Sequence, residues 1–223
     1  MAKFSTTSRT KKPRLKILVS SVVYGQEELL ESIYALLQEF GYEVYMSHKG
    51  TVPIDPGLTA MDNCLRTVEA CDLFLGLILP GYGSGKETAD GPSITHREAV
   101  KAIELNKPRW FLVHEYVAIA RQLLQPYRDD EQDGFKLKAG MTFQKTPILA
   151  DLRILELYEA AMRYDITNVA DRDGNWVQPY GPDDDARLFA IAQFRRYREL
   201  AEKHLPRLKD IEAIRTRLKG NKS

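Results

Sequence analysis

The most apolar segment of the chain is Asp72-Leu73-Phe74-Leu75-Gly76-Leu77-Ile78-Leu79, which ends at Pro80. From Leu73 onward its residues are apolar without interruption instead of alternating with polar ones. A short run of this kind is typical of a strand in a parallel sheet, because helices cover both faces of such a sheet. The run is much shorter than the roughly 20 residues that a transmembrane helix needs.

Helices and strands are predicted to alternate on both sides of this segment. Before it, the sequence predicts a buried strand within Leu15–Val23, an amphipathic helix that Gly41 ends, a short strand at Tyr42–Met46, and a helix that begins at Thr59, with Asp62 in its capping position. After it, a helix begins near Ser93 and a strand follows at Arg109–Val113. This order predicts a doubly wound parallel sheet with right-handed connections.

The pattern changes in the second half of the chain. We expect a flexible arm at 1–13, an α/β domain at 14–125 and a mainly helical region at 126–223, with no clear fifth strand after Leu124. In the last region the sequence predicts helices at 148–162, 185–204 and after Pro206, a weak hairpin at 135–143 and a turn-rich loop at 171–182. Trp110 and Trp176 are interpreted as packing residues.

Composition excludes several classes of function. The 223 residues carry a net charge of +1, which favours neither nucleic-acid nor membrane binding. The first residues lack the apolar core of a signal peptide, so a cytoplasmic location is expected. Cys64 and Cys71 are interpreted as buried apolar residues, and the spacing of Cys and His predicts no metal site.

Candidate ligand-binding residues gather where the predicted strands end. In an open parallel sheet, ligands bind in the crevice outside the carboxyl ends of the strands. Ser20 and Ser21 end the first strand, and their hydroxyls suit ribose or phosphate. The loop Gly81-Tyr82-Gly83-Ser84-Gly85-Lys86 follows the third strand, and its glycines allow close backbone approach to phosphate. It does not have the spacing of a Walker A motif. His48 and His114 follow other strands and are interpreted as ordinary polar residues.

The third candidate group is Ser93-Ile94-Thr95-His96-Arg97-Glu98, which opens the third helix. The role of Glu98 has two interpretations. It could act on a sugar as the carboxylate that stabilises or attacks an oxocarbenium-like centre, with His96 as a proton donor and Arg97 as an anion clamp. Alternatively, Glu98 only completes a capping box with Thr95.

The sequence resembles the bacterial DUF4062 family across about residues 14–115. The resemblance is carried by Lys16–Val22, Cys71–Leu77, Gly81–Ser84, Ser93–Glu98 and Asn106–Arg109, in that order and spacing. It implies a flavodoxin-like fold related to TIR domains and to nucleoside 2-deoxyribosyltransferases. In both relatives a glutamate near the start of the helix after the third strand is catalytic, and Glu98 occupies that place. The additional aspartate of the transferases has no clear counterpart here unless Asp90 supplies it.

The resemblance leads to two hypotheses. In the first, the protein is an N-glycosidase that cleaves NAD or another nucleotide, with Glu98 and His96 catalytic and no required cofactor. Ser20, Ser21, Tyr82, Gly83, Ser84, Ser93, Thr95 and Arg97 would then bind the nucleotide. In the second, it is a non-catalytic module that binds a nucleotide or protein and signals by assembly. TIR-like domains often act as oligomers and the helical second half offers apolar faces, so a homo-oligomer is expected in either case. Family members often lie beside ATPase domains in bacterial defence proteins, so the resemblance also implies a separate defence partner.

Overall fold

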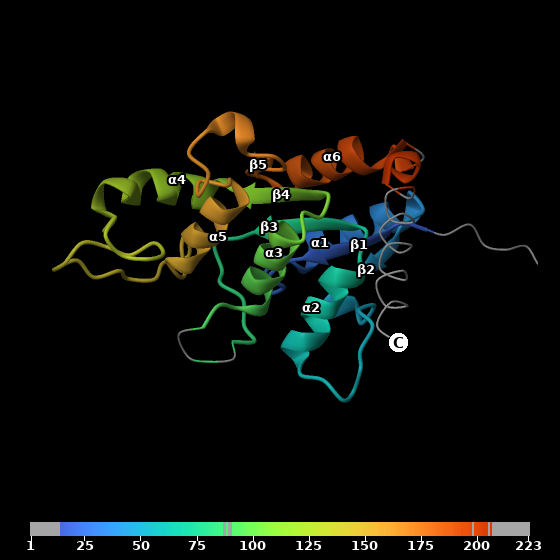
Figure 1. Ribbon diagram of the computed structural model, residues 1–223, viewed down its shortest axis with the longest axis horizontal. Coiled ribbons are helices and arrows are strands. Elements are labelled where there is room, and N and C mark those ends of the chain that lie inside the picture. Colours follow the sequence, from blue (N-terminus) through green and yellow to red (C-terminus); the bar gives the residue numbers. More distant parts are fainter. Residues whose placement is uncertain (1–13, 87, 89–90, 198, 205, 207–223) are drawn as a thin grey trace, which may run out of the picture.

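A computed structural model describes residues 14–86, 88, 91–197, 199–204 and 206, so the predicted arm, Asp90 and the predicted helix after Pro206 lie outside it. Its centre is a five-stranded sheet in the order β2-β1-β3-β4-β5, in which every neighbouring pair is parallel (Figure 1). The strands are β1 Lys16–Ser20, β2 Glu43–Tyr45, β3 Leu73–Ile78, β4 Arg109–His114 and β5 Val177–Tyr180. The predicted doubly wound α/β fold is therefore confirmed.

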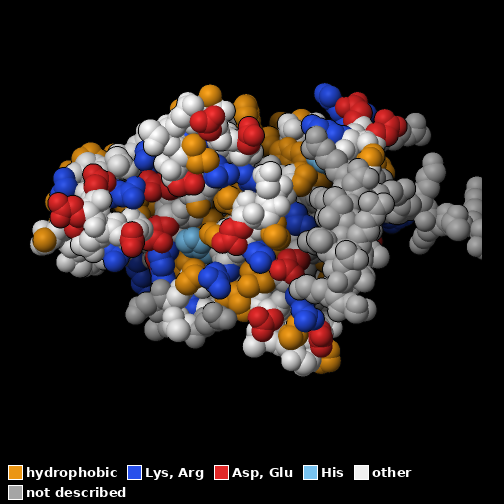
Figure 2. Space-filling model, viewed as in Figure 1, with side chains coloured by type: hydrophobic (Ala, Val, Ile, Leu, Met, Phe, Trp, Pro, Cys, Tyr) orange, Lys and Arg blue, Asp and Glu red, His pale blue; other side chains and the backbone are white. Residues whose placement is uncertain are grey.

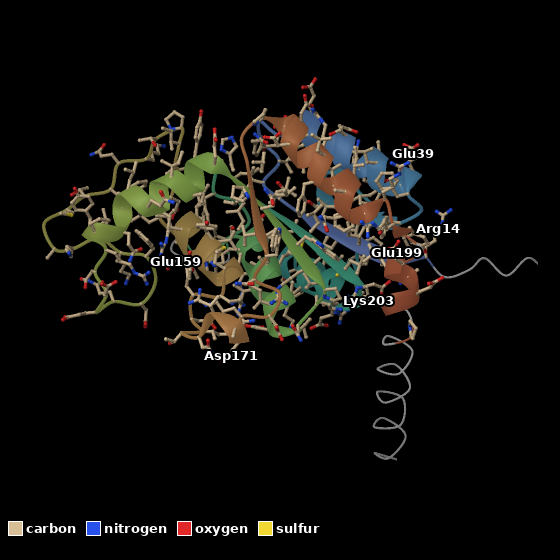
Figure 3. The ribbon with its side chains drawn as sticks, turned by 90° about the horizontal axis from the view of Figure 1, so that it is seen from above. Arg14, Glu39, Glu159, Asp171, Glu199 and Lys203 are labelled. Carbon is tan, nitrogen blue, oxygen red and sulfur yellow. The ribbon has the colours of Figure 1, made fainter. Side chains whose placement is uncertain are left out.

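Helices cover both faces of the sheet. The α-helices are α1 Glu27–Glu39, α2 Ala60–Ala70, α3 Ile94–Glu104, α4 Glu115–Leu124, α5 Arg153–Ala161 and α6 Asp183–Phe194, with short 3-10 turns η1 Ser47–Lys49, η2 Gln125–Tyr127 and η3 Val169–Asp171. α1 and α6 lie side by side on one face (Figure 3), while α3 packs between α2 and α5 on the other face. Among the described residues, no helix combines the length and apolar character needed to cross a membrane.

The central strands are apolar on both sides because each side meets a different core. In β1, Ile17 and Val19 pack in the core under α1 and α6, whereas Leu18 belongs to the core under α2, α3 and α5. All six residues of β3 are buried. This two-sided burial accounts for the uninterrupted apolar run from which the fold was predicted.

The second half of the chain completes the same sheet, which corrects the expectation that no fifth strand follows Leu124. β5 lies beside β4 at the edge, where Val113 is in register with Pro179. Proline is tolerated there because an edge strand has one side without ladder hydrogen bonds. Trp176, which precedes β5, is 66% exposed, so its predicted packing role is wrong. Region 126–223 thus contributes a strand to the sheet as well as helices around it.

Three other predictions for this region differ from the structure. The helix predicted at 148–162 begins only at Arg153, because residues 146–149 form a hydrogen-bonded turn. The helix predicted at 185–204 is interrupted, since α6 ends at Phe194 and residues 195 and 196 are not helical, before helical residues resume at 197 and 199–204. In place of the hairpin predicted at 135–143, the described residues show one isolated bridge, between Arg128 and Leu137.

Gly76 in the middle of β3 has no room for a side chain. A Cβ atom there would lie 2.7 Å from two ring atoms of Phe111 and 3.0 Å from the ring of Phe74. We expect Gly76→Ala to lower the free energy of unfolding by about 1–3 kcal/mol, because both rings are fully buried. Urea unfolding measures this. Gly181→Ala is the matched control, because the atoms nearest to its Cβ would belong to the side chain of Glu115 and not to a buried ring. Equal losses of unfolding free energy in the two variants would contradict the prediction.

Candidate functional site

A cavity of about 220 Å³ opens at the carboxyl ends of β1 and β3, where the strand order changes direction. We call it the Glu98 cavity. It brings together many of the polar residues predicted from sequence, which come from the ends of two strands and from the start of α3. Its lining comprises Leu18, Val19, Ser20, Ser21, Val22, Val23, Tyr24, Ser47, Cys64, Tyr82, Gly83, Ser84, Ile94, Thr95 and Glu98.

Glu98 is held in this cavity by side chains from two other elements. Its carboxyl accepts a hydrogen bond of 2.5 Å from Ser20 Oγ at the end of β1. It also hydrogen-bonds the thiol of Cys64 on α2. Only 7% of Glu98 is exposed, although the residue lines the cavity. The carboxyl group therefore has a fixed position and a small accessible surface that faces a ligand-sized space.

Burial changes the protonation of this group. Desolvation raises the pKa of Glu98 from 4.5 to about 7, although the hydrogen bonds from Ser20 and Cys64 act in the opposite direction. Burial and the neighbouring Glu98 raise the pKa of Cys64 to about 12, so that thiol stays protonated and can donate to the carboxyl. A carboxyl with a pKa near neutrality, in a cleft, is the type of group that enzymes use for proton transfer or charge stabilisation.

The start of α3 shows that Glu98 does not complete a capping box with Thr95, as one of the two interpretations had it. Ser93 is the N-cap, and its Oγ accepts the N–H of His96 at 3.3 Å. Thr95 lies further inside the first turn and lines the cavity instead. Because Ser93 caps the helix, Glu98 is not needed for this purpose, and its carboxyl is turned to Ser20.

The two candidate caps can be separated by mutation. Ser93→Ala removes the acceptor for the His96 N–H, so we expect it to lower the free energy of unfolding by about 1 kcal/mol. Thr95→Ala leaves that hydrogen bond in place and serves as the control. Thermal and urea unfolding of both variants measure the difference. A larger loss for Thr95→Ala than for Ser93→Ala would contradict the assignment of the cap.

The glycine-rich loop after β3 forms one wall of the cavity through Tyr82. The Tyr82 hydroxyl accepts the Ser93 N–H at 3.1 Å and lies 3.0 Å from Nδ1 of His96. The guanidinium of Arg153 lies 4.6 Å from the centre of the Tyr82 ring. Beside it, Gly83 allows the loop to pass close to α3, because a Cβ there would lie 3.1 Å from Thr95 Oγ1. These contacts fix the wall against α3 and α5.

Three residues that were predicted for this site do not line the cavity. Ser93 caps α3. His96 is buried against Tyr82, and burial lowers its pKa to about 4, so its ring is neutral at physiological pH. A neutral imidazole that faces Tyr82 is not placed to protonate a ligand in the cavity; it positions Tyr82. Arg97 is exposed on the surface of α3 and lies outside the lining.

The structure also adds residues that the sequence analysis did not assign to the site. Cys64, read from the sequence as an apolar packing residue, reaches the cavity from α2 and hydrogen-bonds Glu98. Tyr24 and Ser47 line it from the segments that follow β1 and β2. Their position after strands could have suggested them, since those segments meet at one edge of the sheet. No local motif marks Cys64.

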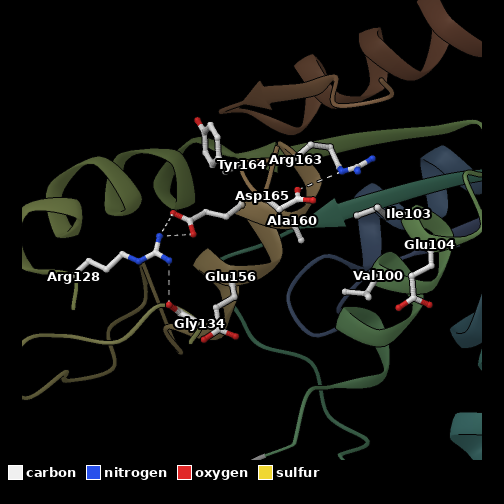
Figure 4. Close-up of a pocket in the computed structure, with 11 residues that line it drawn as sticks. Val100, Ile103, Glu104, Arg128, Gly134, Glu156, Ala160, Arg163, Tyr164 and Asp165 are labelled. Carbon is white, nitrogen blue, oxygen red and sulfur yellow. Dashed lines mark hydrogen bonds and ion pairs between the residues drawn. The ribbon is translucent and has the colours of Figure 1, made fainter. Parts of the chain in front are cut away.

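A second region, between α3 and α5, was not predicted from sequence. It contains a cavity of about 420 Å³ (Figure 4). Most of its charged side chains are engaged with one another or with backbone: Arg128 pairs with Glu159 and bonds Gly134 O, and Arg163 pairs with Asp165. Such closed pairs leave few polar groups for a ligand, and we place the functional site at Glu98.

The described residues contain no group of three or more His, Cys, Asp or Glu side chains arranged to hold a metal ion.

On the face of the molecule in Figure 2, acidic and basic side chains are interspersed. That face does not show a broad patch of one charge.

Comparison with known proteins gives one match. Neither a curated protein nor a solved structure matches the chain. The sequence profile of a family described as a domain of unknown function (DUF4062) matches residues 16–156. The matched segment begins at β1, ends within α5 and contains Ser20, Tyr82 and Glu98. Because it covers more than half of the 223 residues, the chain belongs to the DUF4062 family.

Proposed function

We propose that this protein is an N-glycosidase that cleaves the bond between base and ribose in NAD or another nucleotide. The observation that carries the proposal is the position of Glu98, a buried carboxyl that lines a cavity at the carboxyl edge of the sheet and is hydrogen-bonded to Ser20. The resemblance to TIR domains and deoxyribosyltransferases supports it, since they use a glutamate at this place.

The chemistry that we propose needs only the side chains of this cavity. The bond between the base nitrogen and the anomeric carbon breaks, and the base leaves with the electron pair. Nicotinamide, which is cationic in NAD, leaves as a neutral molecule, whereas the base of an uncharged nucleotide leaves as an anion and then takes the proton that Glu98 receives from the attacking water. The ionised Glu98 stabilises the positive charge that develops on the sugar, in a site from which most water is excluded. Water then adds to the anomeric carbon, and its proton passes to Glu98. Ser20 and Cys64 hold the carboxyl in place.

The nucleotide-binding roles proposed for the remaining residues follow from the same cavity. Ser20 and Ser21 offer their hydroxyl oxygens as acceptors for ribose, since their protons are donated to Glu98 and to the Val22 carbonyl. The segment Tyr82–Ser84 offers backbone N–H groups to phosphate. Thr95 adds a further hydroxyl from the first turn of α3. A helix start of this kind favours an anionic group.

The rate of base release is expected to depend on pH. Since the ionised form of Glu98 is the active one and its pKa is raised to about 7, kcat/KM rises as pH increases through about 7 and then levels off. Initial rates between pH 5 and 9 test this. A rate that is already constant above pH 5 would show that a carboxyl with an ordinary pKa is responsible.

The proposal is tested with purified protein incubated with NAD, NADP and a panel of nucleosides. Released base is followed by chromatography, at low and high protein concentration, for the wild type and for Glu98→Gln. Release that disappears in the variant supports the glycosidase. No release from any substrate, with both proteins folded, favours the non-catalytic binding module.

Assembly and location form part of the same proposal. We expect a cytoplasmic protein from the sequence of its first residues. The resemblance implies that it forms homo-oligomers and works with a separate partner in bacterial defence. The outer side of α4 and η2 presents three exposed apolar side chains outside the Glu98 cavity, which suit contact with another copy: Ile119, Leu123 and Tyr127. The two concentrations in the assay above reveal whether activity depends on assembly.

A further inference from the structure

A third cavity, of about 290 Å³ and distinct from the one between α3 and α5, adjoins the Glu98 cavity. We call it the His114 cavity. It is lined from the loop after β1, from the end of β3 and from the start of α4. Val22 and Tyr24 line both cavities. The two spaces are therefore adjacent along the carboxyl edge of the sheet, and we refer to them together as the crevice.

The length of this crevice exceeds what one nucleoside needs. It runs from Ser47, after β2, to His114, at the end of β4. In the strand order β2-β1-β3-β4 these points are three strand spacings apart, which is about 14 Å. A nucleoside would fill the Glu98 cavity alone, whereas a dinucleotide has a second base that must be placed elsewhere.

His114 and Gln26 supply a hydrogen-bond donor and an acceptor at the His114 cavity. Nδ1 of His114 accepts the N–H of Tyr116 at 3.2 Å. In the neutral ring the proton is then on Nε2, which is a donor. Oε1 of Gln26 is buried and has no hydrogen-bond partner. Turning this oxygen towards a ligand therefore breaks no existing hydrogen bond.

Two tyrosines complete the lining with aromatic surface. Tyr24 is 86% exposed and stands where the two cavities meet, and Tyr116 is 42% exposed at the start of α4. Exposed aromatic rings are suitable platforms on which a planar base can stack, and such stacking does not depend on base identity. The donor and acceptor would supply the selectivity that stacking lacks.

We propose that the His114 cavity binds the second base of a dinucleotide, while the first base and its ribose lie against Glu98. An adenine-type base offers an amine to Gln26 Oε1 and a ring nitrogen to the Nε2–H of His114. This inference rests on the proposed function, because it specifies which nucleotides the Glu98 site takes. It predicts a preference for dinucleotides over nucleosides and mononucleotides.

Calorimetric titration of the full chain tests the inference. All proteins carry Glu98→Gln to prevent turnover, and the probes are NAD, nicotinamide mononucleotide and adenosine monophosphate. We expect NAD to bind at least about tenfold more tightly than nicotinamide mononucleotide. Adding Gln26→Leu should reduce the affinity advantage of NAD to about twofold. The same substitution should weaken the binding of adenosine monophosphate by a similar factor. Adding Trp176→Ala, which removes an exposed aromatic side chain outside both cavities, should leave the affinity advantage of NAD unchanged.

The outcomes separate the subsite from the cleavage reaction. Three results would each overturn the subsite, whether or not the wild type releases base. They are equal affinities for NAD and nicotinamide mononucleotide, no measurable binding of NAD, and an affinity advantage of NAD that remains after Gln26→Leu. A dinucleotide advantage that Gln26→Leu removes, in a protein that releases no base, would support the subsite and refute the glycosidase. Because Gln26 Oε1 has no partner, Gln26→Leu should fold normally; if it does not, Tyr116→Ala provides the same comparison.

Discussion

Base release should fall by about a thousandfold or more when Glu98 is replaced by Gln. The amide has nearly the shape of the carboxyl and can still accept hydrogen bonds from Ser20 and Cys64, so the cavity keeps its form. It cannot carry the negative charge that stabilises a cationic sugar. Removal of a charged catalytic group from a water-poor site typically reduces the rate by this order.

A matched control excludes a general effect of removing a carboxylate from α3. Glu104 is on the same helix but is exposed and lies outside the Glu98 cavity. Glu104→Gln should therefore release base at the wild-type rate. If Glu98→Gln retains more than a tenth of the wild-type rate with an unchanged far-ultraviolet spectrum, Glu98 is not the catalytic carboxylate.

The central part of the fold is predictable because its strands are buried on both faces. β3 is an uninterrupted apolar run, and β1 is apolar at Ile17–Val19 between two polar end residues. Short apolar runs bounded by turn residues are typical of strands in a parallel sheet. β5 has no such run, since it contains Gln178 and Pro179 at the sheet edge and only Tyr180 of its four residues is buried. A strand that depends on pairing with β4 leaves little trace in its own sequence.

The candidate site was predictable as a set of strand-end residues, but its contacts were not. Ser20 and Glu98 are 78 residues apart, and their hydrogen bond exists because α3 crosses beside the end of β1. The spacing from Thr95 to Glu98 fits a capping box equally well, so the local sequence could not show that Ser93 is the cap. The contribution of Cys64 likewise depends on how α2 packs beside α3.

The same burial that prepares Glu98 for chemistry should make the protein less stable as pH rises. The carboxyl has a pKa of about 7 in the folded protein and about 4.5 when the chain is unfolded. Between these values the folded state binds more protons than the unfolded state, so the free energy of unfolding decreases with increasing pH. The Glu98 contribution is complete below pH 4.5 and lost above pH 7, and a difference of this size corresponds to about 3 kcal/mol.

Glu98→Gln isolates this contribution, because Gln does not titrate and all other ionisable groups are shared with the wild type. Relative to wild type, the variant should gain about 3 kcal/mol of unfolding free energy between about pH 4 and pH 8. Urea unfolding at several pH values measures the gain, and Glu104→Gln should show a much smaller change. A constant difference between Glu98→Gln and wild type across this range would mean that burial does not hold Glu98 in its protonated form. The carboxyl would then be ionised at acidic pH, and the predicted rise of kcat/KM near neutral pH would also fail.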